Sequence, residues 1–232
     1  MGLRDAGRLA ANTYTRAAAS ARDKFAEYFV SEQGRLPWQE AVVSQNGLEI
    51  MGLLVKRMKA DFRPYVNAVL PDAVDRLGDS KESVRDKAHI LLIMLMLHTM
   101  SPQLMFEKLT PAFSHKLAKV REEVMVLLQN ALADHGAHAI QLSRLLPSVV
   151  KLLSDPAAPV RDTAFNTLVE VYKHVGERVR LDLQKKFSVP PAKLGPLMAT
   201  FDQVKESGQM MPTATLTLGP AADRLVESPR RS

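Results

Sequence analysis

Residues 70–79 read LPDAVDRLGD, and residues 83–88 read SVRDKA. The pattern returns 76 positions later, as Leu146-Pro147 followed by Val160-Arg161-Asp162. A middle copy around residues 113–128 contains Val120-Arg121, which lies 36 positions after the first Val-Arg pair and 40 positions before the last. Internal repeats of this length are typical of stacked structural units, which build one continuous core from many similar pieces.

Each copy has the same layout. An apolar segment entered through a Pro is followed by a short polar turn opened by Asp or Ser, and Val-Arg then begins a second apolar segment. The second segments are predicted helices with one buried face, because apolar residues recur in them every three or four positions. These residues are Val84, Ala88, Leu91, Leu92 and Leu95, then Val120, Val124, Leu127, Leu128 and Ala131, then Val160, Ala164, Leu168 and Val171. A single hairpin cannot cover such a face, so the sequence predicts an all-α fold, an α-solenoid paddle of stacked HEAT-repeat hairpins.

The two ends of the chain depart from this repeat. We expect residues 1–22 to be a flexible extension, residues 23–206 to form the repeat domain, and residues 207–232 to be a disordered tail rich in Gly, Pro, Thr and Ser. Glycines and a proline interrupt the period between residues 34 and 47. A last helix over residues 193–206 is expected to cover the open end of the stack, through Leu194, Leu197, Met198, Phe201 and Val204.

Composition narrows the possible chemistry. Cys is absent, which excludes disulfides, Cys-based zinc sites and cysteine catalysis. An aromatic content of 6% and only 11 Gly argue against a β-sandwich or barrel, and the longest apolar run, residues 90–97, is too short to span a membrane. The sequence has no Gly-rich phosphate loop and no nucleophile elbow, and His135 and His138 have no third metal ligand nearby. We therefore expect no enzymatic activity, no metal and no cofactor.

Polar residues flank each turn, and we interpret them as structural. An Asp in the turn can cap the helix that follows it, and an Arg six positions later can reach the carboxylate or carbonyls of a neighbouring turn. His115 occupies the Asp position in the middle copy, so we expect the ladder between hairpins to be incomplete there. The predicted ladder consists of Asp79, Arg85, Arg121, Asp155 and Arg161.

Three stretches resemble a known family: residues 70–79, residues 168–180 (LVEVYKHVGERVR) and residues 201–205 (FDQVK). They strongly resemble the first TOG domain of the CLASP family, the CLIP-associating proteins, and the resemblance covers roughly residues 40 to 210. It implies a flat paddle of six HEAT-like hairpins, in which one narrow edge, built from the turns inside the hairpins, engages αβ-tubulin.

Carried over to this sequence, the resemblance places the tubulin-binding edge in three turns and at the single Trp. Residues 114–121 (SHKLAKVR) support this independently, because they contain three cations and no acidic residue and so suit an acidic protein surface. A solvated turn that carries Lys for solubility alone is the alternative. Trp38 can anchor an interface or pack in the core. The candidate tubulin-binding residues are Trp38, Ser80, Lys81, Ser83, His115, Lys116, Lys119, Ala157 and Arg161.

The resemblance further implies a microtubule-associated protein of the cytoplasm and cytoskeleton that stabilises microtubules and supports spindle and kinetochore microtubule dynamics. One alternative is a generic HEAT-repeat scaffold with a non-tubulin partner. Another is a nucleic-acid binder that uses the net charge of +6, which is disfavoured because aromatic residues are not interleaved with the basic turns. We therefore expect a monomer that binds αβ-tubulin and microtubules, and neither nucleic acid nor membrane.

Overall fold

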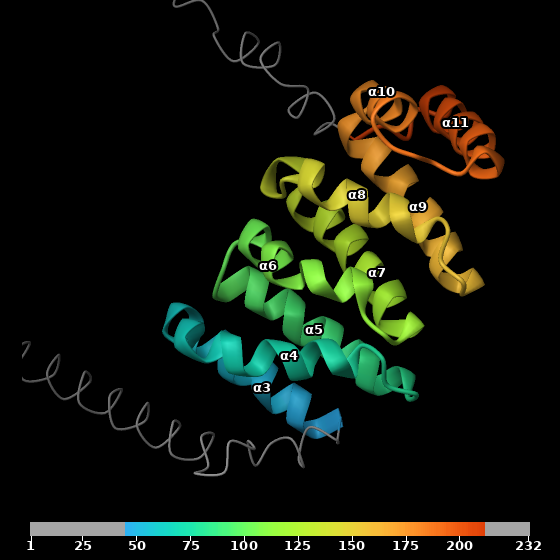
Figure 1. The fold of residues 1–232 in the computed structure, drawn as a ribbon. Coiled ribbons are helices and arrows are strands. Elements are labelled where there is room, and N and C mark those ends of the chain that lie inside the picture. Colours follow the sequence, from blue (N-terminus) through green and yellow to red (C-terminus); the bar gives the residue numbers. More distant parts are fainter. Residues whose placement is uncertain (1–44, 212–232) are drawn as a thin grey trace, which may run out of the picture. The chain divides into compact units, whose positions relative to one another are not determined.

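The computed structural model describes residues 45–211 (Figure 1). The chain divides into two units, Met1–Ile50 and Met51–Ser232, and the described part of the first unit is only the start of helix α3 (Gln45–Met58). The predicted extension at residues 1–22, Trp38 and residues 212–232 of the predicted tail lie outside the described residues. The candidate site is therefore described from the second unit alone.

Helices make up the regular structure of this unit, and residues 45–211 contain no strand, which confirms the all-α fold class. No helix in the described part of the chain is long and apolar enough to cross a membrane. After α3 the elements are η1 (Lys59–Tyr65), α4 (Val66–Arg76), α5 (Glu82–His98), α6 (Pro102–Leu109), η2 (Thr110–Ser114), α7 (Ala118–His135), η3 (Ala137–Ala139), α8 (Leu142–Leu152), α9 (Ala158–Val175), α10 (Glu177–Lys185) and α11 (Pro191–Glu206).

These helices pair as hairpins in chain order. Helix α4 packs on α5, α6 and η2 pack on α7, α8 packs on α9, and α10 packs on α11 (Figure 1). The second helices also follow one another, because α7 contacts α5 on one side and lies along α9 on the other. Each hairpin therefore contacts its neighbours in the chain, which is the arrangement expected of HEAT repeats.

The core lies where the second helices face the rest of the stack. Every apolar residue that the repeat predicted to be buried in α5, α7 and α9 is at most 3% exposed. Complete burial of a Val or Leu side chain stabilises a fold by about 1.5 to 3 kcal/mol relative to exposure, so these three rows supply much of the driving force for stacking. The predicted helical face is confirmed.

The prolines of the first helices are not at the positions that we expected. The repeat predicted that Pro marks the entry to each first helix, but Pro71 and Pro147 are the sixth residues of the eleven-residue helices α4 and α8. Both rings are exposed. Proline lacks an N–H and its ring crowds the carbonyl four residues earlier, so it is tolerated inside a helix where the chain can bend away from the core.

The last hairpin closes the C-terminal end of the stack. Helix α9 ends at Val175 and is capped by Gly176, which adopts a φ of 73°, and α10 follows directly. The ring of Tyr172 stacks on that of Phe201 in α11 with centroids 4.1 Å apart, and the Arg180 guanidinium lies 5.6 Å from the Tyr172 centroid. Helix α11 begins two residues before the expected position, at Pro191, and buries Leu197, Phe201 and Val204. Residues 207–211, predicted to belong to the tail, continue with defined contacts, since the Met211 N–H donates to the Lys173 carbonyl.

Candidate functional site: the turn edge

Three turns connect the first and second helices of successive hairpins. We call residues 77–81 turn 1, residues 114–117 turn 2 and residues 153–157 turn 3, and together these turns form the turn edge. They follow one another along the right side of the stack in Figure 1. Each ends at the N-cap residue of the next helix, and the three N-cap residues have almost the same backbone conformation. The φ and ψ angles are −82° and 123° at Lys81, −83° and 124° at Leu117, and −82° and 124° at Ala157.

A side chain two residues before each N-cap closes the turn. Oδ1 of Asp79 accepts the Lys81 N–H at 2.9 Å, and Oδ1 of Asp155 accepts the Ala157 N–H at 2.9 Å. The expectation that these Asp residues cap the helix was therefore wrong in detail, because they bond the N–H of the N-cap residue and not a free N–H inside the first turn of the helix. The turn is closed before the helix begins.

In turn 2 a histidine performs the same task. Nδ1 of His115 accepts the Leu117 N–H at 3.2 Å, so the ring nitrogen replaces the carboxylate oxygen of the other two copies. The opposite ring nitrogen, Nε2, lies 3.3 Å from Oδ1 of Asp75 in α4. A neutral imidazole with its proton on Nε2 satisfies both contacts at once. The substitution of Asp by His thus preserves the turn while removing a carboxylate.

The Arg of each Val-Arg pair closes its own turn a second time. One terminal guanidinium nitrogen donates to the carbonyls of the residues six and five positions earlier in all three copies. The donor–acceptor distances are 2.9 and 3.1 Å from Arg85 to Asp79 and Ser80, 2.6 and 3.3 Å from Arg121 to His115 and Lys116, and 2.7 and 2.9 Å from Arg161 to Asp155 and Pro156. Each turn backbone is therefore fixed by two side chains: the Asp or His inside the turn, and the Arg of the helix that follows.

The same guanidinium groups also connect neighbouring hairpins, in two different ways. Arg121 donates from Nε and Nη2 to both carboxylate oxygens of Asp155 in turn 3, at 2.7 and 2.8 Å. This hydrogen bond pair lowers the pKa of Asp155 against the opposing effect of burial. The equivalent partner of Arg85 would be residue 115, but His115 has no carboxylate. The Nε of Arg85 lies instead 3.3 Å from Oε1 of Glu123 in α7. Within residues 45–211, Arg161 forms no ion pair with the next hairpin.

Glu123 collects three donors and so replaces the missing turn carboxylate. Besides Arg85, Nε2 of His89 lies 2.8 Å from Oε2 and Nζ of Lys119 lies 3.0 Å from Oε1. Burial opposes ionisation of Glu123, but the hydrogen bonds from His89 and Lys119 outweigh it and lower its pKa to about 2. The carboxylate is therefore ionised at neutral pH and ties α5 to α7.

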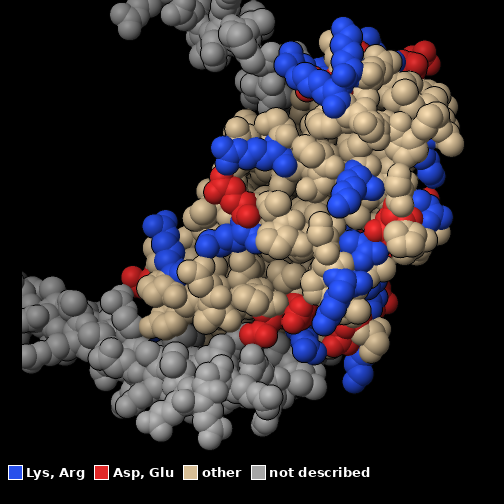
Figure 2. Space-filling view, in the orientation of Figure 1, with Lys and Arg blue, Asp and Glu red and all other residues tan. Residues whose placement is uncertain are grey.

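The charge on turn 2 is smaller than the sequence suggested. Nζ of Lys119 lies between Glu122 at 2.9 Å and Glu123 at 3.0 Å, and Arg121 is paired with Asp155. Only Lys116 of the three expected cations is exposed without an ion pair among the described residues. Figure 2 shows the charges on one whole face of the molecule, where many Lys and Arg side chains have Asp or Glu beside them.

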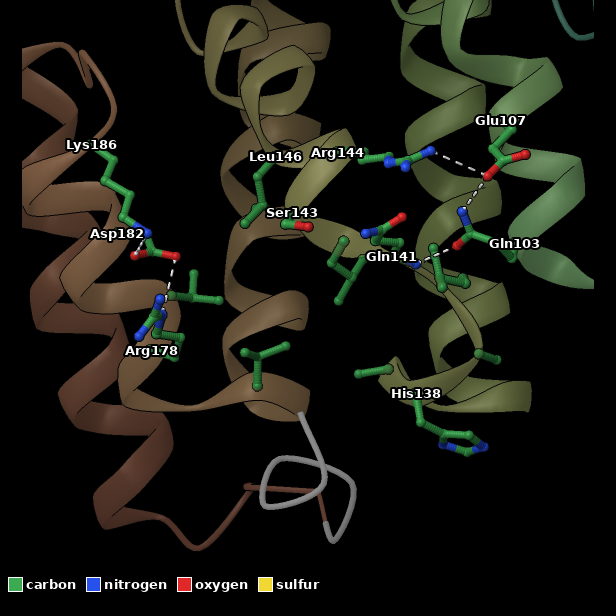
Figure 3. Close-up of a pocket in the computed structure, with 16 residues that line it drawn as sticks. Gln103, Glu107, His138, Gln141, Ser143, Arg144, Leu146, Arg178, Asp182 and Lys186 are labelled. Carbon is green, nitrogen blue, oxygen red and sulfur yellow. Dashed lines mark hydrogen bonds and ion pairs between the residues drawn. The ribbon is translucent and has the colours of Figure 1, made fainter. Parts of the chain in front are cut away.

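A separate cleft of about 830 Å³ lies away from the turns, between α6, the start of α8 and α10 (Figure 3). Its charged side chains pair with one another, for example Arg144 with Glu107 at 3.5 Å and Lys186 with Asp182 at 2.9 Å. His138 lines the cleft, but the described residues contain no group of three His, Cys, Asp or Glu that could hold a metal ion. Ser143 and His138 both line the cleft, but among the described residues no hydrogen bond joins the two side chains, and they lie apart in Figure 3.

The family is settled by comparison with known proteins. A family model described as "CLASP N terminal" matches residues 40–189. The chain belongs to the CLASP family. Among its relatives, the CLIP-associating protein of Drosophila melanogaster is 45% identical over 186 residues, which are 78% of this chain and 12% of that protein. This CLASP-family chain spans 11 to 12% of the length of its CLIP-associating relatives from Drosophila melanogaster, Xenopus laevis and Xenopus tropicalis.

Solved structures agree with this assignment. The MAST/Orbit N-terminal domain is 42% identical, with a TM-score of 0.69, and the match covers 78% of each chain. A TOG domain described for its tubulin binding specificity and its promotion of microtubule dynamics and mitotic spindle formation is 20% identical, with a TM-score of 0.58, over 68% of this chain and 60% of that chain. At this identity the likeness shows the fold alone. The HEAT-repeat fold predicted for this CLASP-family chain is therefore confirmed as that of TOG domains.

The turn edge of this CLASP-family chain brings together most of the residues that the sequence selected. Ser80, Lys81 and Ser83 are exposed around turn 1, whereas Arg161 is half-buried and occupied by turn 3. The sequence reasoning gave no role to Leu117, which lies in the predicted basic stretch and is 45% exposed in turn 2. It also overlooked Glu122 and Glu123 as partners of Lys119, although their spacing of three and four residues is readable once the helix is known to begin at residue 118.

Proposed function

We propose that this CLASP-family chain binds αβ-tubulin through its turn edge and acts as a microtubule-associated domain. The observation that carries the proposal is the shared geometry of the three turns, whose N-cap residues agree in φ and ψ within about one degree and whose backbones are each fixed by an Arg. A row of rigid, regularly placed turns suits the recognition of one extended protein surface. Membership of the CLASP family, whose relatives are named CLIP-associating proteins, and the TOG fold support the same partner.

In this proposal the residues of the turn edge, and of the helix starts that follow it, have two roles. Lys81 and Lys116 present positive charge to tubulin, and Ser80, Ser83 and Ala157 allow its surface to approach closely. The remaining members hold the turns in shape or border the interface, with Trp38 as a further anchor from the first unit. These members are His115, Lys119 and Arg161.

The finer features of the function belong to the same proposal. The chain acts without catalysis, as a monomer, through residues 23–206, and it works on microtubules in the cytoplasm, including those of the spindle and kinetochore. It stabilises microtubules there. Mixed charge on the face drawn in Figure 2 supports a protein partner over nucleic acid, because a phosphate backbone is bound by gathered cations. No membrane contact is part of the proposal.

One observation favours a second candidate, a HEAT-repeat scaffold with a non-tubulin partner. Lys119 and Arg121, two of the three cations that the sequence assigned to turn 2, are neutralised within the domain. A weakly charged edge is less selective for an acidic partner.

Binding of purified tubulin separates these candidates. Gel filtration with free αβ-tubulin and co-sedimentation with microtubules are run for the wild type, for Lys81→Glu/Lys116→Glu, and for Lys56→Glu/Arg57→Glu as a control. The control changes the same amount of charge on exposed residues in the last turn of α3. We expect the turn-edge variant to lose binding and the control to keep it.

Two results would contradict the proposal. Equal binding by both double variants would remove the turn edge from the interface. A wild type that binds neither free tubulin nor microtubules, at low and at moderate salt, would favour the scaffold candidate.

A further inference from the structure

Leu117 is the one large exposed apolar side chain within the three turns. The other exposed apolar side chains of this size in the described part of the chain lie in helices or at the C-terminal end, at Ile50, Leu53, Ile90, Leu97, Leu104, Leu181 and Met211. Single exposed leucines are common on protein surfaces and need no function. The position and support of Leu117 distinguish it from the others.

The backbone of Leu117 is fixed on both sides. Its N–H donates to Nδ1 of His115, and its carbonyl accepts the Arg121 N–H at 3.4 Å. The carbonyl of the preceding residue, Lys116, accepts from the Arg121 guanidinium. The equivalent positions in the other turns carry Lys81 and Ala157 on the same backbone conformation. The edge thus presents a cationic, an apolar and a small side chain from three N-cap residues that share one backbone conformation.

The side chain of Leu117 also rests against a neighbouring turn. A Cβ added to Gly78 in turn 1 would lie 3.0 Å from Cδ1 of Leu117 and 2.8 Å from Cγ2 of Val120. A side chain at residue 78 would therefore press on both Val120 and Leu117. The glycine allows Leu117 to lie directly on the backbone of turn 1, which restricts its rotamers before any partner arrives and lowers the entropic cost of binding.

Two free cations belong to the same edge as this apolar side chain: Lys116 precedes it in turn 2, and Lys81 occupies the equivalent N-cap position in turn 1. Both are exposed, and neither forms an ion pair within residues 45–211, whereas Lys119 and Arg121 are held by Glu123 and Asp155. An apolar side chain on an edge that also carries free cations matches an apolar spot bordered by carboxylates. Apolar anchors at the centre of a polar rim are where binding free energy concentrates in protein interfaces.

We infer that Leu117 is the apolar anchor of the turn edge and inserts into an apolar, carboxylate-bordered spot on the αβ-tubulin dimer. The inference rests on the proposed tubulin binding and adds a contact residue to it. Because apolar burial is not screened by salt, the contribution of Leu117 differs from that of Lys116 in its response to ionic strength.

The test compares two leucines of equal exposure. Leu117→Ser is compared with Leu181→Ser in α10, since both side chains are 45% exposed. Serine is a preferred N-cap residue, so Leu117→Ser leaves the start of α7 intact, and the melting temperatures of both variants verify folding. Leu117→Met, which keeps an apolar side chain, serves as the rescue. The Kd for free αβ-tubulin is measured at low and at moderate salt.

We expect Leu117→Ser to raise the Kd about fivefold, or about 1 kcal/mol, at both salt concentrations. Leu181→Ser and Leu117→Met are expected to bind like the wild type. Lys116→Glu, in contrast, is expected to weaken binding more at low salt than at moderate salt. If wild type and both serine variants share one Kd, the anchor is overturned while tubulin binding stands. If the wild type shows no binding, the proposed function itself fails and the anchor fails with it.

Discussion

The connection between turns 2 and 3 differs from the connection between turns 1 and 2, although the same repeat builds both. Between turns 2 and 3, one Arg holds both oxygens of one carboxylate, and the side chains of Arg121 and Asp155 are only 12% and 6% exposed. Between turns 1 and 2, residue 115 is His where the other two copies have Asp. The ion pair there lies in the helices, where Glu123 accepts from three side chains. One connection is a single strong pair and the other is a distributed network.

The comparison teaches that a repeat can lose a residue and keep its geometry. His115 still closes its turn through Nδ1, and Arg85 still closes its own turn through two carbonyls. What changes is the partner across the hairpins. Stability in the two halves of the edge therefore depends on different residues, and substitutions can separate them.

Removal of Asp155 is expected to have the largest effect. Asp155→Ala removes two charge-assisted hydrogen bonds to the half-buried Arg121 and the bond to the Ala157 N–H, which is expected to cost about 2 to 3 kcal/mol. The equivalent change in turn 1, Asp79→Ala, removes a hydrogen bond to the Lys81 N–H and a partly exposed ion pair with Arg76, and is expected to cost about 1 kcal/mol. Urea unfolding of both variants measures the free energies of unfolding. If both variants lost the same free energy of unfolding, the Asp residues of turns 1 and 3 would contribute equally and the comparison would fail.

Acidification is expected to act mainly on the distributed network. The pKa of Glu123 is lowered from 4.5 to about 2 in the folded chain, so its contribution to stability is complete above about pH 4.5 and disappears as the pH falls toward 2. Because the site is partly open to solvent, we expect this shift to contribute about 1 to 2 kcal/mol. Glu123→Gln carries no such charge, and its free energy of unfolding is expected to fall less than that of the wild type between about pH 5 and about pH 2.5.

The control for this experiment uses the other connection. The pKa of Asp155 is also lowered, so part of the acid sensitivity is expected to survive in Glu123→Gln. Urea midpoints at several pH values measure both contributions. An identical pH profile for wild type and Glu123→Gln would contradict the role assigned to Glu123.

Restoring the repeat residue is expected to have the smallest effect, and a stabilising one. His115→Asp offers Arg85 a carboxylate in turn 2, as Asp155 does for Arg121 in turn 3, and we expect a gain of about 1 kcal/mol. The change also removes the contact of His115 with Asp75, which is 59% exposed on its side chain, so the gain is modest. The midpoint of thermal unfolding measures it. A lower midpoint would show that turn 2 is built around the imidazole.

The helices of the stack were predictable because their signal is local. Apolar residues at spacings of three and four located α5, α7 and α9 and named their buried faces correctly. Pro71 and Pro147 misled the expectation for the first helices, since the restriction that proline imposes on the backbone is equally compatible with a helix start and with an exposed position inside a helix. The sequence pattern alone does not distinguish the two.

The candidate site was predictable in position and less so in charge. The Val-Arg pairs located all three turns, and the residues of those turns lie where the repeat placed them. The sequence counted Lys119 and Arg121 as free cations because their partners lie outside the turn, one a helical turn later and the other in the next hairpin. Leu117 lay in the predicted basic stretch but received no role, because an exposed leucine has no pattern of its own.

By itself, the sequence determined that this chain is a stack of helical hairpins of the CLASP family, with turns of repeated composition between the helices. These features follow from short-range periodicity and from motifs that keep their spacing. Only the tertiary structure decided which carboxylate each Arg takes, which lysines remain free and where Leu117 lies on Gly78. Those outcomes depend on how neighbouring hairpins are offset against each other, and the offset is fixed by packing between residues more than thirty positions apart.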